Sequence, residues 1–306
     1  MKSLLDTEGF ARAQPWLGTL VGIRVRDVGA CADAQAAVAA AFAAVQRVHE
    51  LMSFHDPDSE LSELNRRAAR DAVAVSPWTF EVLTRAVEIA VASAGIFDCA
   101  VAPQLIRTGH LPVPASCDLA QFPAGPNHRG FHEQVQLLPQ QRIRFGTAML
   151  IDLGGIAKGF AVDRAVDVLR EHGIAAASVN AGGDLRVFGE AMETIFVRLP
   201  SDRSRVVPLA SLRDAALATS ADYGSAPARS PPVRNTTPFV DARSGACCGQ
   251  GISVSVRAPD CMTADALTKV VLVSRDEHHP ALEGFGASAA ILGADADAGA
   301  GAAGCT

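Results

Sequence analysis

The sequence predicts a fold that mixes strands and helices, because two hydrophobic periods occur along the chain. Residues 17–26 and 252–257 alternate apolar and polar side chains, which is typical of half-buried strands. Residues 33–52 instead carry apolar side chains at helical spacing. With 306 residues, 49% of them hydrophobic and 20% charged, the chain can bury a sizeable core. The patterns indicate mixed content and leave the topology open.

Capping residues predict two further helices in the first half of the chain. Pro57 interrupts the helical pattern, and Ser59 can cap a short new helix after it. Ser76 followed by Pro77 opens another helix, which Gly95 can close. Its inward face is expected to consist of Phe80, Leu83, Val87 and Val91. Several prolines and glycines between 108 and 148 predict loops that join short strands.

Glycine turns flank a helix expected at the centre of the chain, from about 156 to 172. A short strand at 151–153 would lead into Gly154–Gly155, and Gly173 would end the helix. The strands expected next are 174–180 and 185–188, joined by a turn at 181–184. The sequence therefore predicts a βαβ-like unit here.

The last third of the chain is expected to contain one more strand and helix. Thr263 can cap a helix over 264–273, after the strand at 252–257. The Pro-, Ser- and Arg-rich stretch 224–238 predicts a surface loop. Residues 294–306 are of low complexity and are expected to form a disordered tail.

Composition excludes several classes of function. The net charge is −6 without a basic run, and aromatic residues make up 5%, so we expect no nucleic-acid binding. No apolar stretch reaches membrane-spanning length. Asp6 and Glu8 stand where a secretory signal would be apolar, and the seven cysteines lack zinc-ligand spacing. We therefore expect a cytoplasmic protein with reduced thiols.

Three short segments could bind a nucleotide or could be purely structural. The glycine turn before Lys158 could bind a phosphate group through the N–H groups of the helix start and through the lysine. It could equally be a tight packing turn followed by a solvated lysine. Asp184 after a second glycine turn could hold a ribose hydroxyl, although bracing its own turn is the more common role. Phe97–Asp98 could form a ring-binding corner or, more commonly, a helix end with a core Phe.

The segment from Asp260 to Lys269 is the strongest candidate for a metal site. An Asp and a Thr hydroxyl one turn apart can present oxygen atoms to Mg²⁺, although Thr263 with Asp265 is also an ordinary helix start. The histidines show no ligand spacing, and most are expected at the surface. These are His55, His110, His128 and His132.

Taken together and in order, seven segments resemble the FAD:protein FMN transferases, the ApbE-type flavin transferases. They are MSFHDPDSELSELN, GIFDCAVAP, IDLGGIAKGFAVDRA, VNAGGDLRVFG, ATSADYG, VDARSG and APDCMTADAL. The resemblance divides the chain into an N-terminal lead-in (1–16), a flavin-transferase-like domain (17–293) and the tail (294–306). It implies an α+β fold of the T-fold-like type, with mixed sheets flanked by helices.

The resemblance also implies the reaction and the residues that perform it. The family binds FAD in a cleft with Mg²⁺ at the diphosphate, and a threonine of a target flavoprotein takes the FMN while AMP leaves. The implied FAD contacts are Leu17, His55, Ile96, Phe97, Asp98, Gly154 and Phe160, with Lys158 and Asp184 near the nucleotide. The implied metal ligands are the carbonyl of Ala157, Asp265 and the helical positions just after it, among them Thr268.

This sequence departs from the family pattern at three positions. His55 replaces an aromatic, commonly Tyr, that lies against the flavin. Lys269 replaces a metal-binding Thr; an ammonium cannot ligate a metal, but it can pair with Asp265 four residues before it. Lys269 would then supply the charge that Mg²⁺ gives, or weaken metal binding, and with Asp265 it is our candidate for catalysis. Pro238 replaces a histidine that is a candidate general base.

These departures leave two alternatives to a transferase. One is an FAD-binding protein of the same fold with weak or no transfer activity. The other is an FAD pyrophosphatase, in which water replaces the threonine and the products are FMN and AMP.

Overall fold

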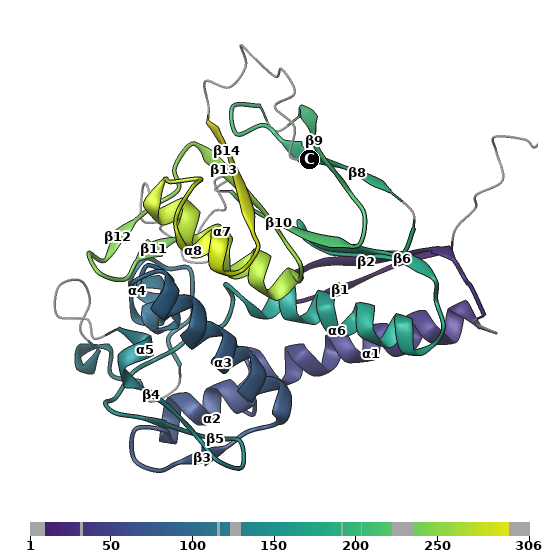
Figure 1. Cartoon of the computed structure of the whole chain (residues 1–306). Coiled ribbons are helices and arrows are strands. Elements are labelled where there is room, and N and C mark those ends of the chain that lie inside the picture. Colours follow the sequence, from purple (N-terminus) through teal and green to yellow (C-terminus); the bar gives the residue numbers. More distant parts are fainter. Residues whose placement is uncertain are drawn as a thin grey trace, which may run out of the picture.

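The computed structural model describes residues 10–30, 33–114, 117–122, 130–190, 192–202, 204–221 and 236–293. Its main element is a seven-stranded sheet of order β1-β2-β6-β7-β10-β13-β14, in which every neighbouring pair is antiparallel. Helices lie against it and extend away from it (Figure 1). The α+β class is confirmed.

The large sheet consists of β1 (Ala11–Trp16), β2 (Thr19–Asp27), β6 (Ala176–Ala181), β7 (Asp184–Phe188), β10 (Ala215–Ala221), β13 (Ile252–Ala258) and β14 (Ser288–Gly293). Smaller sheets are formed by β3 (Val73–Ala74), β5 (Arg142–Phe145) and β4 (Val135–Leu138), by β8 (Glu193–Arg198) and β9 (Val206–Leu212), and by β11 (Val240–Asp241) and β12 (Ala246–Cys247). The helices are α1 (Ala34–Met52), α2 (Glu60–Arg67), α3 (Pro77–Ala92), α4 (Ala102–Arg107), α5 (Phe131–Gln134), α6 (Ala157–Glu171), α7 (Cys261–Ser274) and α8 (Ala281–Gly284), with 3₁₀ turns η1 (Cys99–Val101) and η2 (Leu119–Gln121).

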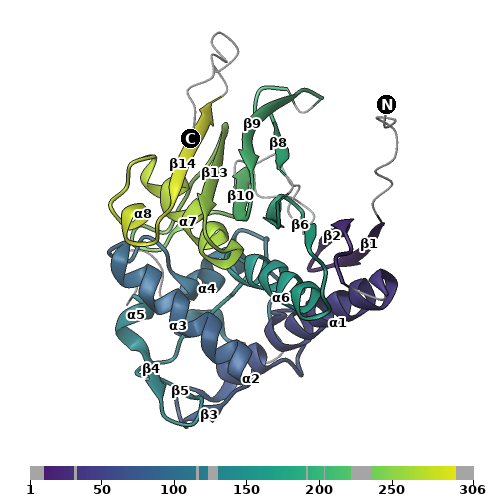
Figure 2. The ribbon, with the colours of Figure 1, turned by 45° about the vertical axis from the view of Figure 1, so that its right-hand side comes forward.

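Helices α1, α6 and α7 connect the large sheet to the rest of the molecule. Helix α1 lies beside α6, and α6 and α7 pack on strands β6, β7, β10 and β13 (Figures 1 and 2). On β13, Val254 and Val256 are fully buried, and Ser253 and Ser255, which point to the other face, are buried as well. Helices α2–α5 and the small sheet of β3–β5 lie on the side of this helix layer away from the large sheet.

The second face of the large sheet is covered near its centre by the β8–β9 hairpin. Leu185 and Val187 of β7 and Leu217 of β10 form a small separate core with Ile195 and Leu212 of the hairpin. The middle strands are therefore buried on both faces, which fixes their register.

The predicted helix caps are mostly confirmed. The side chains of Ser59 and Ser76 accept hydrogen bonds from the N–H groups three residues later, at 3.0 and 3.3 Å, and so begin α2 and α3. The predicted cap at Thr263 is wrong. Asp260 caps α7 instead, accepting from the N–H of Thr263 at 2.7 Å, because the helix already begins at Cys261.

The predicted βαβ-like unit is wrong because residues 151–153 form no strand. The N–H of Ile151 donates to the side chain of Asn65 (2.8 Å), and the N–H of Asp152 donates to the carbonyl of Cys99 (2.8 Å). These hydrogen bonds hold the segment extended without a strand partner. Strands β6 and β7, which follow α6, are antiparallel neighbours joined by a glycine turn.

Two other sequence predictions need correction. The first predicted strand begins at Thr19, because Leu17 and Gly18 form a turn with positive φ, and an unpredicted strand, β1, precedes it. On α3, Val91 is 60% exposed, because the buried face runs instead through Val82, Leu83, Ala86, Ile89 and Ala90. Most of the expected loop at 224–238 and the whole tail at 294–306 lie outside the described residues.

Within the described ranges, no helix has both the length and the apolar character needed to cross a membrane.

Candidate functional site

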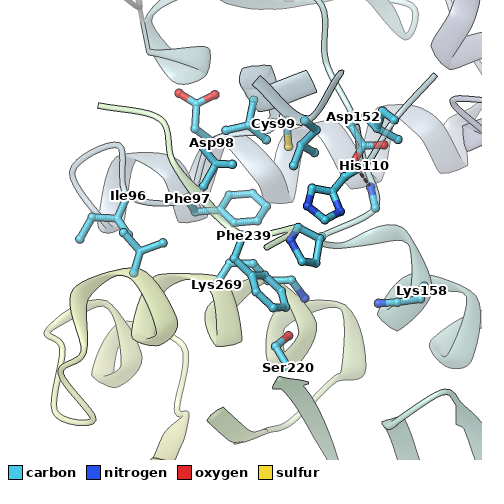
Figure 3. A pocket seen from close by; sticks show the side chains of 18 of the residues that line it. Ile96, Phe97, Asp98, Cys99, His110, Asp152, Lys158, Ser220, Phe239 and Lys269 are labelled. Carbon is cyan, nitrogen blue, oxygen red and sulfur yellow. Dashed lines mark hydrogen bonds between the residues drawn. The ribbon is translucent and has the colours of Figure 1, made fainter. Parts of the chain in front are cut away.

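A pocket of about 360 Å³ lies where the start of α6 meets α7 and the ends of several loops. Many of the predicted site residues line it: Ile96, Phe97, Asp98, Gly154, Lys158, Asp184 and Lys269. They come from segments far apart in sequence, and Figure 3 shows Lys158 and Lys269 on the side of Ser220, below the ring of Phe97. The size is within the range of small-molecule sites.

Four charged side chains form a cluster at the base of this pocket, which we call the charge cluster: Lys158, Asp184, Asp265 and Lys269. The Nζ of Lys158 lies 2.6 Å from the carboxylate of Asp184 and 3.4 Å from that of Asp265. The Nζ of Lys269 pairs with the other oxygen of Asp265 and donates to its backbone carbonyl at 3.0 Å. The predicted pairing of Lys269 with Asp265 is confirmed.

Burial and pairing together determine the charges of this cluster. Burial opposes ionisation of Asp265, yet Lys158 and Lys269 hold its pKa below the ordinary value. Burial likewise opposes the charge of Lys158, yet Asp184 and Asp265 raise its pKa above the ordinary value. Burial and the nearby charge of Asp265 raise the pKa of Asp184. Lys158 and Asp265 therefore remain ionised at neutral pH, as an ion pair at the base of the pocket.

The cluster exists because α6 and α7 approach unusually closely. A Cβ at Gly159 would lie 2.8 Å from the Cα of Met262, so a larger residue does not fit without a shift of the helix. The N–H of Gly159 donates to Asp265 at 3.1 Å. One turn later, Asp163 accepts hydrogen bonds from the N–H groups of Cys261 and Met262 at 2.9 and 2.8 Å. The start of α7 is thereby fixed on α6.

The turn before α6 brings backbone to the edge of the pocket. Asp152 accepts a hydrogen bond from the N–H of Gly154 at 3.1 Å, and burial raises the pKa of this carboxyl. A Cβ at Gly154 would lie 2.9 Å from the Asp152 carboxylate, and one at Gly155 would contact the Lys269 side chain at 3.5 Å. Gly155 therefore leaves backbone directly beside the Lys269 side chain, whereas Gly154 faces the carboxylate of Asp152.

The wall facing the charge cluster is apolar and comes from loops. Phe97, which is 4% exposed, and Phe239 present rings to the pocket (Figure 3). Asp98 lies at the rim with its side chain pointing away from the lysines, and it accepts from the N–H groups of Ala100 (2.6 Å) and Phe131 (3.0 Å). The pocket thus combines flat apolar rings with two ammonium groups that are paired with carboxylates, an arrangement that offers an aromatic ring a packing surface and a phosphate group two cationic donors.

Comparison with known proteins identifies the family. The sequence profile of the ApbE family matches residues 17–289. The chain belongs to the ApbE family.

Relatives and solved structures of this family agree along most of the chain. An FAD:protein FMN transferase of Vibrio cholerae is 28% identical over 272 residues, covering 86% of this chain and 80% of that protein. The ApbE protein of Thermotoga maritima superposes with a TM-score of 0.75 at 26% identity, over 94% of this chain and 97% of that one. The flavin transferase ApbE of Vibrio cholerae superposes with a TM-score of 0.73 at 24% identity, over 94% of this chain and 98% of that one. The last likeness shows the shared fold.

Several predicted site residues of this ApbE chain lie outside the pocket lining. Leu17 is half-buried in the β1–β2 turn, and His55 is exposed after α1, its ring 6.4 Å from that of Phe54. Phe160 is fully buried in the core, edge to face with Trp78 at 6.0 Å. Ala157 is the buried first residue of α6. The hydroxyl of Thr268 is buried, donating to the carbonyl of Asp265 and contacting Ser220, both at 2.7 Å.

The structure also revises how three segments were interpreted. Lys158 is neither solvated nor free, since it pairs with Asp184. Asp184 does not brace its own turn: the side chain of Asn180 does so, accepting from the N–H of Gly183 at 3.0 Å. Asp98 begins η1 and does not end a helix.

Sequence reasoning missed pocket residues that come from loops. His110 belongs to the histidines of which most were expected at the surface, but it is half-buried and its ring lies in the pocket near Asp152 (Figure 3). Its segment carries no motif, so the sequence holds no signal for its place. Asp152 and Phe239 stand in or beside recognisable motifs and could have been found. Pro238, where the family carries a histidine, also lines the pocket.

The residues around Asp265 do not fit the Mg²⁺ that the family resemblance implies. Mg²⁺ requires close to six oxygen ligands in octahedral geometry. Both carboxylate oxygens of Asp265 already face donors, from Lys269 on one side and from Lys158 and Gly159 on the other. Within the described parts of the chain, no group of three or more His, Cys, Asp or Glu side chains could hold a metal.

Proposed function

We propose that this ApbE-family chain is an FAD:protein FMN transferase, which moves FMN from FAD to a threonine of an acceptor flavoprotein and releases AMP. The observation that carries the proposal is the pair Lys158 and Lys269 beside the Gly154–Gly155 turn, facing two aromatic rings in one pocket. Relatives of the chain, including that of Vibrio cholerae, are named for this reaction.

In this proposal the pocket holds FAD by its diphosphate and by a ring. The lysines of the charge cluster and the backbone of Gly155 bind the diphosphate, because ammonium and N–H donors suit phosphate oxygens. The N–H of Gly154 already donates to Asp152. Phe97 and Phe239 pack against a ring of FAD. Ile96 and Asp98 line the rim, while Leu17, His55 and Phe160 remain proposed contacts on the family resemblance alone.

The reaction exchanges one phosphorus–oxygen bond for another. The threonine hydroxyl oxygen attacks the FMN-side phosphorus, the bond from that phosphorus to the bridging oxygen breaks, and AMP leaves with the bridging oxygen. Lys158 and Lys269 balance the negative charge that develops on the phosphoryl oxygens and on AMP. The hydroxyl proton passes to a base in the pocket.

His110 is the base that we propose. Pro238 carries no proton acceptor, whereas an imidazole titrates near neutral pH and can accept a proton there. The carboxylate of Asp152 also lines the pocket, but it already accepts the N–H of Gly154 and so supports the glycine turn. His110 lies on the pocket wall next to Leu111, on the loop after α4.

We further propose that the protein works in the cytoplasm. The described cysteines 99, 117, 247, 248 and 261 are free thiols, as expected in a reducing compartment. Cell fractionation tests this directly.

One incubation separates the transferase from its alternatives. The purified chain is mixed with FAD and a threonine-containing acceptor domain, with and without Mg²⁺, and protein and nucleotides are analysed by mass spectrometry. The proposal predicts FMN attached to an acceptor threonine together with AMP. Free FMN with AMP would instead show a pyrophosphatase, and unchanged FAD would show a binding protein. An acceptor with that threonine replaced by valine is the control, which should stay unmodified.

A further inference from the structure

The ammonium group of Lys269 lies against the oxygen atoms of Asp265 that a metal ion would have to bind. Asp265 is 0% exposed, and the Nζ of Lys269 contacts its outer carboxylate oxygen as well as its backbone carbonyl at 3.0 Å. The second oxygen receives the N–H of Gly159 at 3.1 Å and faces Lys158 at 3.4 Å. A cation bound at Asp265 would have to displace an ammonium group from a buried ion pair, which is costly.

Lys269 also reaches toward the pocket. Its side chain is 19% exposed, and its Cε lies 3.5 Å from the position of a Cβ on Gly155, at the glycine turn. An ammonium group has three hydrogens, and Asp265 accepts two of them from Lys269. The third is available to an anion lying against the turn. Lys158 flanks the same space, with a side chain that is 29% exposed.

We propose that Lys269 takes the place of the divalent cation, so that this chain binds the diphosphate of FAD without metal. The inference rests on the proposed binding of FAD in this pocket. Asp265 then positions the Lys269 ammonium and is not a metal ligand. The fixed positive charge of the site is built from Lys158 and Lys269, and FAD binding should be insensitive to chelators.

The test is FAD titration, followed by flavin fluorescence, in EDTA and in Mg²⁺, with calorimetric titration of Mg²⁺ alone as a second readout. We expect the unmodified chain to bind FAD equally in both buffers and to give no saturable Mg²⁺ heat. The Lys269→Thr variant introduces a hydroxyl oxygen that can bind a metal ion. It also removes the ammonium group from one carboxylate oxygen of Asp265. It should bind FAD about ten- to a hundredfold more weakly in EDTA, the effect of one lost charge-assisted hydrogen bond, and recover in Mg²⁺.

Two controls separate charge from ligation. Lys269→Met removes the charge without adding a ligand, so its FAD affinity should fall and Mg²⁺ should not restore it. Arg213→Met removes a surface cation, 60% exposed and away from the pocket, and should bind FAD as the unmodified chain does. A thermal melt verifies that each variant is folded.

Tight, saturable Mg²⁺ binding by the unmodified chain, or a tenfold loss of its FAD affinity in EDTA, would overturn the inference, and this needs no variant. Failure to bind FAD in either buffer would instead overturn the proposed function. The two failures are therefore distinguishable.

Discussion

The two walls of the pocket are built in opposite ways. The α6–α7 wall is regular helix with a buried ionic network, in which Gly159 permits contact and Asp163 and Asp265 bind the two helices together. The facing wall is made of loops around Phe97, His110 and Phe239, positioned mainly by packing and by a few backbone hydrogen bonds. The comparison indicates that the helical wall fixes charged groups, whereas the loop wall supplies rings and carries His110, the base that we propose.

The largest effect is expected from the loop wall, at His110. His110→Gln removes the proposed proton acceptor and should slow FMN transfer by about 10²–10⁴-fold, while weakening FAD binding far less. The transfer rate of the unmodified chain should fall at acid pH, since a protonated ring accepts no proton, and the variant should lose this dependence.

Stopped-time transfer assays across pH measure this effect. His278→Gln, at an 88% exposed surface histidine, is the control and should be unaffected. An unchanged rate and pH profile in the His110 variant would assign the proton acceptor elsewhere.

The next effect should come from the ionic network of the helical wall. Asp265→Ala leaves the Lys269 ammonium without its buried partner and should lower the free energy of unfolding by about 3–5 kcal/mol. Pairing holds the pKa of Asp265 below its ordinary value, so this carboxylate stabilises the fold above about pH 4 and loses that effect as the pH falls further. The stability of the variant should therefore depend less on pH in this acid range.

Urea unfolding at several pH values measures both changes. The matched control is Asp167→Ala, which breaks a half-exposed ion pair with Arg164 within α6. It should lower the free energy of unfolding by about 0–1 kcal/mol. Equal losses in the two variants would contradict the structural importance of the cluster.

A smaller effect tests the close contact of the helices. Gly159→Ala adds a methyl group against the backbone of Cys261 and Met262 and should destabilise the fold by about 1–3 kcal/mol through overpacking. Gly284→Ala, where a Cβ meets nothing within 4 Å, is the control in the same urea experiment. A neutral Gly159 variant would show that α7 can move away freely.

The smallest effect should come from removing a ring of the loop wall. Phe239→Leu keeps apolar area but loses ring stacking, worth about 0.5–1.5 kcal/mol, so FAD affinity should fall about two- to tenfold. Phe196→Leu, at an exposed ring on β8, is the control for the titration. An unchanged affinity would place the rings of FAD away from Phe239.

The sequence predicted the helical wall better than the loop wall, for physical reasons. Helical periodicity and i,i+4 pairing are local, so the extent of α6 and the contact between Asp265 and Lys269 follow from spacing, although the cap of α7 was misplaced. The approach of Gly159 to α7 depends on two segments about a hundred residues apart and has no local signature. His110 reaches the pocket because its loop packs there, which no periodicity reports.

The same limit explains the error at 151–153. Two buried apolar residues, Ile151 and Leu153, flank Asp152, and such a segment becomes a strand only where a strand partner is present. Here Asn65 and Cys99 supply the hydrogen bonds instead.

The central claim is that the cationic wall of this ApbE-family chain binds FAD through its diphosphate. The most direct measurement is titration of the chain, and of Lys158→Met, with FAD and with riboflavin, which lacks phosphate. We predict saturable FAD binding at micromolar concentration, much weaker riboflavin binding, and loss of most of that difference in the variant. Riboflavin binding as tight as that of FAD, or no saturable binding of either, would contradict the claim.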